Sequence, residues 1–299
     1  MSVYEISEKI SLMDLSEIKH WGYFHAGGKY VHTESPRAEG ENTSPVKHIM
    51  QGQLYAEVYV PYHVTKKFPV IFLPGNNQTS LTWKTLRMDA RAGLSISGNT
   101  AMSYIWLMFL SEDEPMRSWR KTRKNNKAMQ LAMKEAAAPL FEKTGPAVVI
   151  THSQSGPFGW IMADTCPGMV KGMVQLEPKG PPFHDDSKRR SENAVWGLTE
   201  IPLHYVPEVQ DPSELRRESV RQLPNLSDVP IMIMTGTASK HARYDHLTAD
   251  YLRQAGVKHV KHMKLADAGL YGNEHMIMIE KNNLEAAALA LNWIEKTIN

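Results

Sequence analysis

The sequence predicts an α/β protein with a mostly parallel central sheet flanked by helices. Short apolar runs rich in β-branched residues alternate along the chain with helical segments of ten or more residues. Strands separated by helices of that length are typical of parallel sheets with helices on both faces. The 299 residues are 42% hydrophobic and 22% charged, which is ordinary for a globular protein and sufficient for a large core. One proline-rich stretch, 178–229, interrupts the alternation.

The N-terminal half is expected to begin with strands. Residues 18–31 predict a hairpin that turns at Gly27 and Gly28, followed by a polar loop over 32–47. Residues 49–60 alternate between polar and apolar side chains, as a half-exposed strand does. The pattern then predicts a buried strand at 68–73, a helix near 83–92, an apolar strand at 101–110 and a Lys/Met/Ala-rich helix at 124–143.

The C-terminal half repeats the order of strand and helix. Residues 147–151 begin with four consecutive apolar side chains and predict a short buried strand, which leads into a helix that ends near 165. The remaining expected elements are strands at 170–176, 231–234 and 260–265 and helices at 244–255 and 283–298.

The proline-rich stretch is interpreted as an insertion. It has mixed charge, two short apolar patches and no strand pattern. The alternative is an irregular surface excursion, but about fifty residues without structure are unusual in a compact domain. The sequence therefore predicts a core domain made of 1–180 and 230–299, with a helical cap at 181–229.

A serine between the strand at 147–151 and the helix that follows it is the strongest functional signal. Ser153 lies in the run Thr151-His152-Ser153-Gln154-Ser155-Gly156. A strand, a tight turn with serine at its tip and a helix form the context of a G-x-S-x-G nucleophile elbow, whose neighbouring residues must be small. Here Thr151 and Ser155 take the small positions. The alternative is an ordinary polar loop in which Ser153 caps the helix.

A serine nucleophile needs a base and an acid that orients the base. His275 lies in a Gly-rich loop after the last strand and before the last helix, which agrees with the chain order Ser, acid, His. Glu177 is placed where the strand at 170–176 ends, with Pro178 behind it. Asp245, which follows the strand at 231–234, is the alternative acid.

Two backbone N–H groups are expected to form an oxyanion hole. One belongs to Gln154, the residue after the nucleophile, and the other to the turn that follows the strand at 68–73. In that turn Gly75 permits the bend and Asn76 is the expected donor. Asn76 or Asn77 could also cap a helix, and the two roles are compatible.

Together these motifs resemble the α/β-hydrolase superfamily. Within it, the chain is similar to bacterial and fungal esterases whose triad acid is a glutamate after strand six. The matching motifs are Gly75-Asn76-Asn77-Gln78-Thr79 with Trp83, Thr151 to Gly156, Glu177-Pro178, and Gly272-Asn273-Glu274-His275-Met276. The resemblance covers about 18–298 and implies a serine carboxylic ester hydrolase that works through an acyl-enzyme without a cofactor. Pro74 stands where the family usually has histidine, and 86–118 differ from the family pattern, so the substrate stays undetermined.

Other functions remain open from the sequence. The same triad could serve acyl transfer or the cleavage of amide or C–C bonds, and a hydrolase fold can also serve as a non-catalytic ligand receptor. A zinc site is not expected, because His241, His246, His259 and His262 lack the short paired spacing of zinc ligands. The serine argues against hydrolases of this fold that use an aspartate nucleophile.

Aromatic side chains near the expected site suggest a neutral, largely apolar carboxylic ester or lactone as substrate. The predicted substrate-binding residues are Tyr104, Trp106, Trp196 and Tyr205, accompanied by Phe183 and many methionines. Such side chains form adaptable apolar walls, although most of them could equally belong to the core.

Charge and cysteine content limit the partners and the compartment. The net charge of +2 points to neither nucleic acid nor an anionic membrane, and the basic run 117–124 is interpreted as the solvated start of a helix. No apolar run is long enough to span a bilayer, and 1–14 do not look like a signal peptide. Cys166 is the one cysteine, so no internal disulfide can form. We therefore expect a cytosolic enzyme that binds a small molecule; export of a processed chain and a homodimer are left open.

Overall fold

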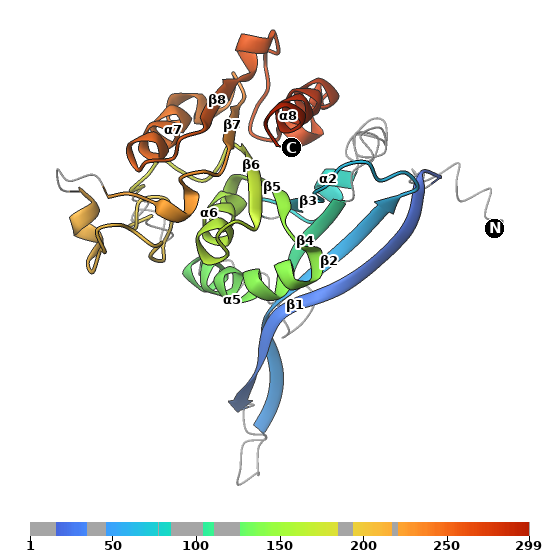
Figure 1. Cartoon of the computed structure of the whole chain (residues 1–299), viewed down its shortest axis with the longest axis vertical. Helices are drawn as coiled ribbons and strands as arrows, with labels where there is room; N and C mark the ends of the chain where they lie inside the picture. Colours follow the sequence, from blue (N-terminus) through green and yellow to red (C-terminus); the bar gives the residue numbers. More distant parts are fainter. Residues whose placement is uncertain are drawn as a thin grey trace, which may run out of the picture.

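In the part of the chain that the structure describes, the strands form one eight-stranded sheet (Figure 1). The computed structural model describes residues 16–34, 46–76, 78–84, 104–110, 126–184, 194–216 and 221–298. The strands are β1 (Ile18–Glu34), β2 (Val46–Pro61), β3 (Val70–Leu73), β4 (Tyr104–Leu110), β5 (Ala147–His152), β6 (Val170–Leu176), β7 (Ile231–Thr235) and β8 (Val260–Lys264). Their order in the sheet is β1-β2-β4-β3-β5-β6-β7-β8. β2 pairs antiparallel with both β1 and β4, while β4, β3, β5, β6, β7 and β8 pair with one another in parallel, which confirms the predicted sheet.

Helices cover both faces of the sheet, so the central strands are buried on both sides. The α-helices are α2 (Leu81–Lys84), α5 (Asn126–Thr144), α6 (Gly156–Thr165), α7 (Asp245–Gln254) and α8 (Asn283–Thr297). Alternate residues of β5 separate the two layers: Val149 packs in the cluster that contains α5, α6 and α7, and Val148 packs in the cluster that contains α8. This double burial is why β5 reads as a continuous apolar run rather than as an alternating one.

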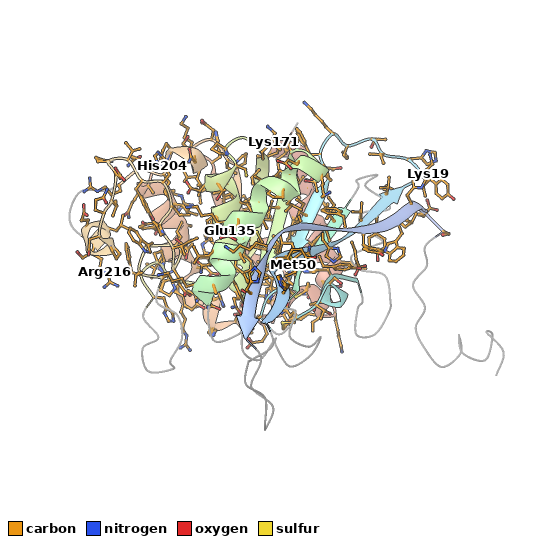
Figure 2. All side chains as sticks on the ribbon, turned by 90° about the horizontal axis from the view of Figure 1, so that it is seen from below. Lys19, Met50, Glu135, Lys171, His204 and Arg216 are labelled. Carbon is orange, nitrogen blue, oxygen red and sulfur yellow. The ribbon has the colours of Figure 1, made fainter. Side chains whose placement is uncertain are left out.

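The long β1–β2 hairpin corrects one sequence expectation. Its strands continue to Glu34 and from Val46, so the chain does not turn at Gly27 and Gly28. Both glycines have positive φ (68° and 86°) inside the strand. A Cβ atom at Gly27 would lie 2.7 Å from the Cβ of Ala136 in α5. Glycine is used here for close helix packing, and Figure 2 shows α5, with Glu135, crossing the hairpin.

Most other predicted elements agree with the structure to within a few residues. The helix expected near 83–92 begins as α2, and its remainder lies outside the described residues. The strand expected at 101–110 is β4 from Tyr104 onward. Among the described helices, none is both long and apolar enough to cross a membrane.

The described residues of 181–229 contain turns rather than α-helices. They form two 3-10 turns, Pro212–Arg216 and Pro224–Leu226, and an antiparallel bridge between Val206 and Gln222. Proline lacks the N–H that a helix interior requires, which explains the missing helices. This stretch is nevertheless anchored, because the N–H of His204 donates to Asp164 Oδ2 on α6 (3.0 Å) and several of its apolar side chains are buried in the core.

Candidate active site

Ser153 stands at the tip of a strained turn between β5 and α6. Its φ is +54°, a value that residues other than glycine rarely adopt unless their surroundings enforce it. The Ser153 carbonyl accepts the N–H of Lys179 at 2.7 Å. Behind the serine, a Cβ atom at Gly156 would lie 2.6 Å from the Cβ of Pro178. Close packing of this turn against the end of β6 therefore requires small residues after the serine and holds its backbone in place.

Ser155 explains the second small position of the elbow. Its Oγ accepts the N–H of His152 at 2.9 Å and lies 2.9 Å from the carbonyl oxygen of Leu73, the last residue of β3. The hydroxyl thus ties the nucleophile turn to the end of the neighbouring strand.

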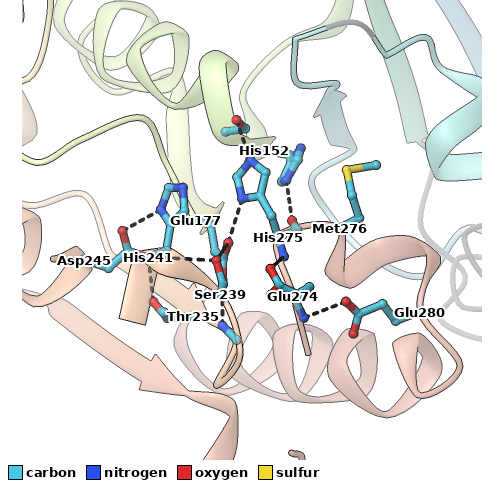
Figure 3. Close-up of polar contacts among 12 residues, drawn as sticks. His152, Glu177, Thr235, Ser239, His241, Asp245, Glu274, His275, Met276 and Glu280 are labelled. Carbon is cyan, nitrogen blue, oxygen red and sulfur yellow. Dashed lines mark hydrogen bonds and ion pairs between the residues drawn. The ribbon is translucent and has the colours of Figure 1, made fainter. Parts of the chain in front are cut away.

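Three chain segments bring serine, histidine and glutamate into one hydrogen-bonded row. His275 Nε2 lies 2.8 Å from Ser153 Oγ, and His275 Nδ1 lies 2.7 Å from Glu177 Oε2 (Figure 3). Because a carboxylate only accepts, Nδ1 carries the proton and Nε2 is free to accept from the serine hydroxyl. The His275 side chain is 30% exposed and Glu177 is fully buried, so the row runs from solvent into the interior.

The buried carboxylate of Glu177 has every oxygen engaged. Oε1 accepts the N–H of Gly236 (2.8 Å), and Oε2 accepts the hydroxyl of Ser239 (2.7 Å) as well as the His275 ring N–H. A buried charge is tolerated only when it is paired and hydrogen-bonded in this way. The loop after β7 therefore holds the acid of the row, although Glu177 itself comes from the end of β6.

Asp245, the alternative acid, faces another histidine. Its carboxyl oxygens lie 2.9 Å from His241 Nδ1 and 2.7 Å from Thr235 Oγ1. Burial raises the pKa of Asp245 to about 8. The carboxyl group of Asp245 is turned toward His241, whereas Glu177 contacts His275 directly.

The turn after β3 passes close to Ser153. A Cβ atom at Gly75 would lie 2.6 Å from His152 Nδ1 and 3.2 Å from Ser153 Cβ, so only glycine fits. The Gly75 N–H donates to the Gln78 side chain at 2.9 Å. Asn76, the predicted donor, is exposed beside this point, and Asn77 lies outside the described residues. On the other side, the Gln154 side chain donates to Asn126 at the start of α5.

His152 is a buried site residue that the sequence reasoning did not identify. Its Nε2–H donates to the carbonyl oxygen of His275 at 2.8 Å, and its Nδ1 lies 3.0 Å from Gln78 Nε2. Burial, reinforced by the nearby His275, lowers the pKa of His152 to about 3, so the ring is neutral. His152 thus connects the Gly75 turn to the His275 loop. The available signal was a polar residue at the end of a strand buried on both faces, the same signal that marked Glu177.

The predicted substrate-binding residues have different surroundings. Tyr205 is 2% exposed, and its hydroxyl lies 2.8 Å from the Trp196 carbonyl oxygen and 3.1 Å from Tyr251 Oη, so it packs as a core residue. Trp196 is half-buried. Tyr104 and Trp106 lie on β4 with side chains outside the described part of the structure.

Within the described residues, one group of side chains has the spacing of metal ligands. It consists of Glu177, His241 and His275, whose ligand atoms lie within 4.8 Å of one another. These are not the four histidines weighed from the sequence, of which only His241 belongs to the group. Glu177 already accepts three hydrogen bonds, and His275 Nδ1 supplies one of them, so a metal ion there would have to displace the row described above.

A metal ion and the hydrogen-bonded row would need the same atoms of Glu177 and His275, so metal removal can distinguish them. Incubation with EDTA, followed by dialysis, is expected to leave ester hydrolysis unchanged, because the hydrogen bonds of Glu177 and His275 need no cation. The measurement is the initial rate on a p-nitrophenyl ester before and after chelation, with a known zinc hydrolase treated in parallel. Loss of activity that returns on adding Zn²⁺ would instead assign the group to a metal centre.

No family model matches the chain. A curated fungal protein named "Probable secreted lipase phiG" is 30% identical, over 92% of this chain and 89% of its own length.

That relative corrects the expected location. It is described as secreted, which contradicts the cytosolic location predicted from the sequence. A single cysteine forms no internal disulfide in either compartment, and a nearly neutral net charge fits both. Composition therefore carried no information that could separate them.

Solved structures share the fold over nearly the whole chain. A bacterial esterase matches with a TM-score of 0.62 and 17% identity over 94% of this chain and 96% of its own. An esterase from Pyrobaculum calidifontis matches with a TM-score of 0.50 and 14% identity over 99% and 93% of the two chains. At these identities the similarity to solved structures concerns the fold alone, and the assignment to a family depends on the fungal relative. The chain belongs to the α/β-hydrolase superfamily, among its esterases and lipases.

Proposed function

We propose that the protein is a serine carboxylic ester hydrolase with Ser153 as nucleophile, His275 as general base and acid, and Glu177 as the acid that orients the base. The observation that supports this most directly is the continuous row from Ser153 Oγ through both nitrogens of His275 to Glu177, with separations of 2.8 and 2.7 Å. Hydrogen-bond reach between nucleophile, base and orienting group is the arrangement that activates a serine.

The proposed reaction proceeds in two halves. His275 Nε2 takes the hydroxyl proton as Ser153 Oγ attacks the ester carbonyl, and the same nitrogen then protonates the leaving alkoxide. A water molecule repeats the sequence on the acyl-enzyme and releases the acid. Glu177 keeps the proton on Nδ1 and stabilises the imidazolium that forms in each half.

We propose that the N–H groups of Gln154 and Asn76 bind the developing oxyanion. Gln154 follows the nucleophile directly, and Asn76 follows Gly75, which packs against Ser153. The Gly75 N–H is already used by Gln78, so the next N–H along the turn is the better placed donor. Donors fixed before the reaction stabilise the oxyanion without the cost of reorganisation.

A cap at 181–229 over a core of 1–180 and 230–299 is part of the proposal. Its described residues approach the site through Glu200, which pairs with Lys179 at 2.9 Å between two largely buried side chains. The backbone N–H of Lys179 in turn binds the Ser153 carbonyl. Glu200 therefore links this stretch to the segment that supports the nucleophile.

The substrate is proposed to be a neutral, largely apolar ester or lactone. The description of the fungal relative as a lipase supports an ester as the substrate. Trp196, Tyr104 and Trp106 remain the proposed apolar wall, while the burial of Tyr205 points to a structural role for it.

A panel of p-nitrophenyl esters and aryl lactones tests this specificity. We expect kcat/KM to rise with acyl length from acetate to longer chains, because each buried CH₂ adds about 0.8 kcal/mol to binding. Trp196→Ala is expected to flatten that rise, and Trp293→Ala on α8 serves as a matched control away from the stretch 181–229. A preference for charged or peptide substrates would overturn the proposal.

A further inference from the structure

A second histidine lies flat against His275. The rings of His241 and His275 are 4.6 Å apart between centroids and inclined by only 10° (Figure 3). His152 lies on the same imidazole at the same centroid distance but inclined by 42°. The proposed catalytic base is therefore flanked by two further imidazoles, and the ring of His241 lies nearly parallel to it.

His241 is itself held by a buried network. Its Nδ1 lies 2.9 Å from Asp245 Oδ1, and its backbone N–H donates to Ser239 Oγ at 3.2 Å. Ser239 also donates to Glu177, so one short loop after β7 fixes both the stacked ring and the orienting carboxylate. Asp245 is anchored in turn by Thr235 at 2.7 Å. His241 is 3% exposed and Asp245 fully buried, so this support is rigid and closed to water.

The His241–Asp245 pair adds no charge beside the base near neutral pH. Burial lowers the pKa of His241 to about 4 and raises the pKa of Asp245 to about 8. A charged carboxylate at this point would compete with Glu177 for the His275 imidazolium. A neutral ring instead presents a flat surface that constrains orientation.

We propose that His241, aligned by Asp245, is a positioning residue that fixes the plane of the His275 imidazole between Ser153 and Glu177. Imidazole rotation about χ2 is intrinsically broad, and both hydrogen bonds of His275 depend on that angle. A flat neighbour 4.6 Å away restricts the rotation, and in the proposed mechanism His241 takes no part in the proton transfers themselves. The proposal rests on the proposed function of this triad.

Two substitutions at His241 distinguish the effect of a flat ring beside His275 from the effect of filling the same space. His241→Phe keeps an aromatic plane and loses the bond to Asp245, while His241→Leu fills similar space without a plane. We expect His241→Leu to lower kcat by roughly 10- to 100-fold with KM within about twofold, since misorientation of catalytic groups reduces the chemical step. His241→Phe is expected to recover most of the loss. Rates are expressed per active site, counted by titration with a fluorophosphonate, so an unfolded fraction does not enter the comparison.

A pair of variants at Asp245 repeats the test without altering the stacked ring. Asp245→Ala removes the anchor of His241 and is expected to lower kcat, whereas Asp245→Asn can still bind both His241 and Thr235 and should restore it. This pair decides the matter if His241→Leu yields no titratable sites. Equal kcat for Leu and Phe at position 241, or for Ala and Asn at position 245, would overturn the positioning role. Failure of the fluorophosphonate to label the unmodified protein would instead reject the proposed function itself.

Discussion

Replacing Ser153 by alanine is expected to abolish acyl-enzyme formation and to lower kcat by about 10⁶-fold, the loss seen when the nucleophile of a serine triad is removed. The physical reason is that no other hydroxyl is in reach of His275 Nε2 in the described site, where Ser153 Oγ lies at 2.8 Å. His275→Ala is expected to give a loss of similar size, because nucleophile and base act as one unit.

The measurement combines steady-state hydrolysis of a p-nitrophenyl ester with labelling by a fluorophosphonate. The unmodified protein should be labelled at Ser153 and the alanine variant should not. Ser213, an exposed serine on a 3-10 turn, provides the matched control, and Ser213→Ala should keep both labelling and turnover. Normal turnover by Ser153→Ala or His275→Ala would reject the assignment, and ligand binding without labelling would identify a receptor on a hydrolase fold.

Glu177→Gln is expected to lower kcat by on the order of 10²–10⁴, with little change in the fold. Glutamine can keep a hydrogen bond to His275, but it lacks the charge that stabilises the imidazolium and can favour the wrong tautomer. It also replaces a carboxylate whose oxygens accept from Gly236 and Ser239, and its NH₂ group cannot accept.

Asp245→Asn is the paired variant, and it is expected to lower kcat far less than Glu177→Gln does. Asparagine can accept from His241 Nδ1 and bind Thr235 Oγ1, so kcat should fall only within about fivefold, as for an ordinary retained hydrogen bond. Comparison of kcat and thermal melting for the two variants decides between the acids. If Asp245→Asn is crippled while Glu177→Gln stays active, the orienting acid is Asp245, and the roles of Ser153 and His275 are unaffected.

Local patterns in the sequence were enough to predict the α/β fold and the residues of the hydrogen-bonded row. Alternating and continuous apolar patterns located the strands because burial on one or both faces of a sheet leaves a local period in the chain. The strand, turn and helix around Ser153 are likewise local, as are the small residues at Ser155 and Gly156. Glu177 and His275 could be found because each follows a predicted parallel strand, and the carboxyl ends of parallel strands share one edge of the sheet.

The tertiary structure alone decided how these residues are supported. The sequence predicts a turn at Gly27 and Gly28, yet Gly27 serves the close approach of Ala136, which lies over a hundred residues away, and Gly28 lies against Gln53 and Met50 of β2. His152 and His241 acquire their roles from His275, and Tyr205 is a core residue because of Trp196 and Tyr251. Asp245 and Glu177 are both candidate acids in the sequence. Only the structure shows that the carboxyl group of Asp245 faces His241 and that of Glu177 faces His275. Contacts between distant segments leave no period and no spacing in the chain, so their partners are fixed only when the sheet and its helices pack.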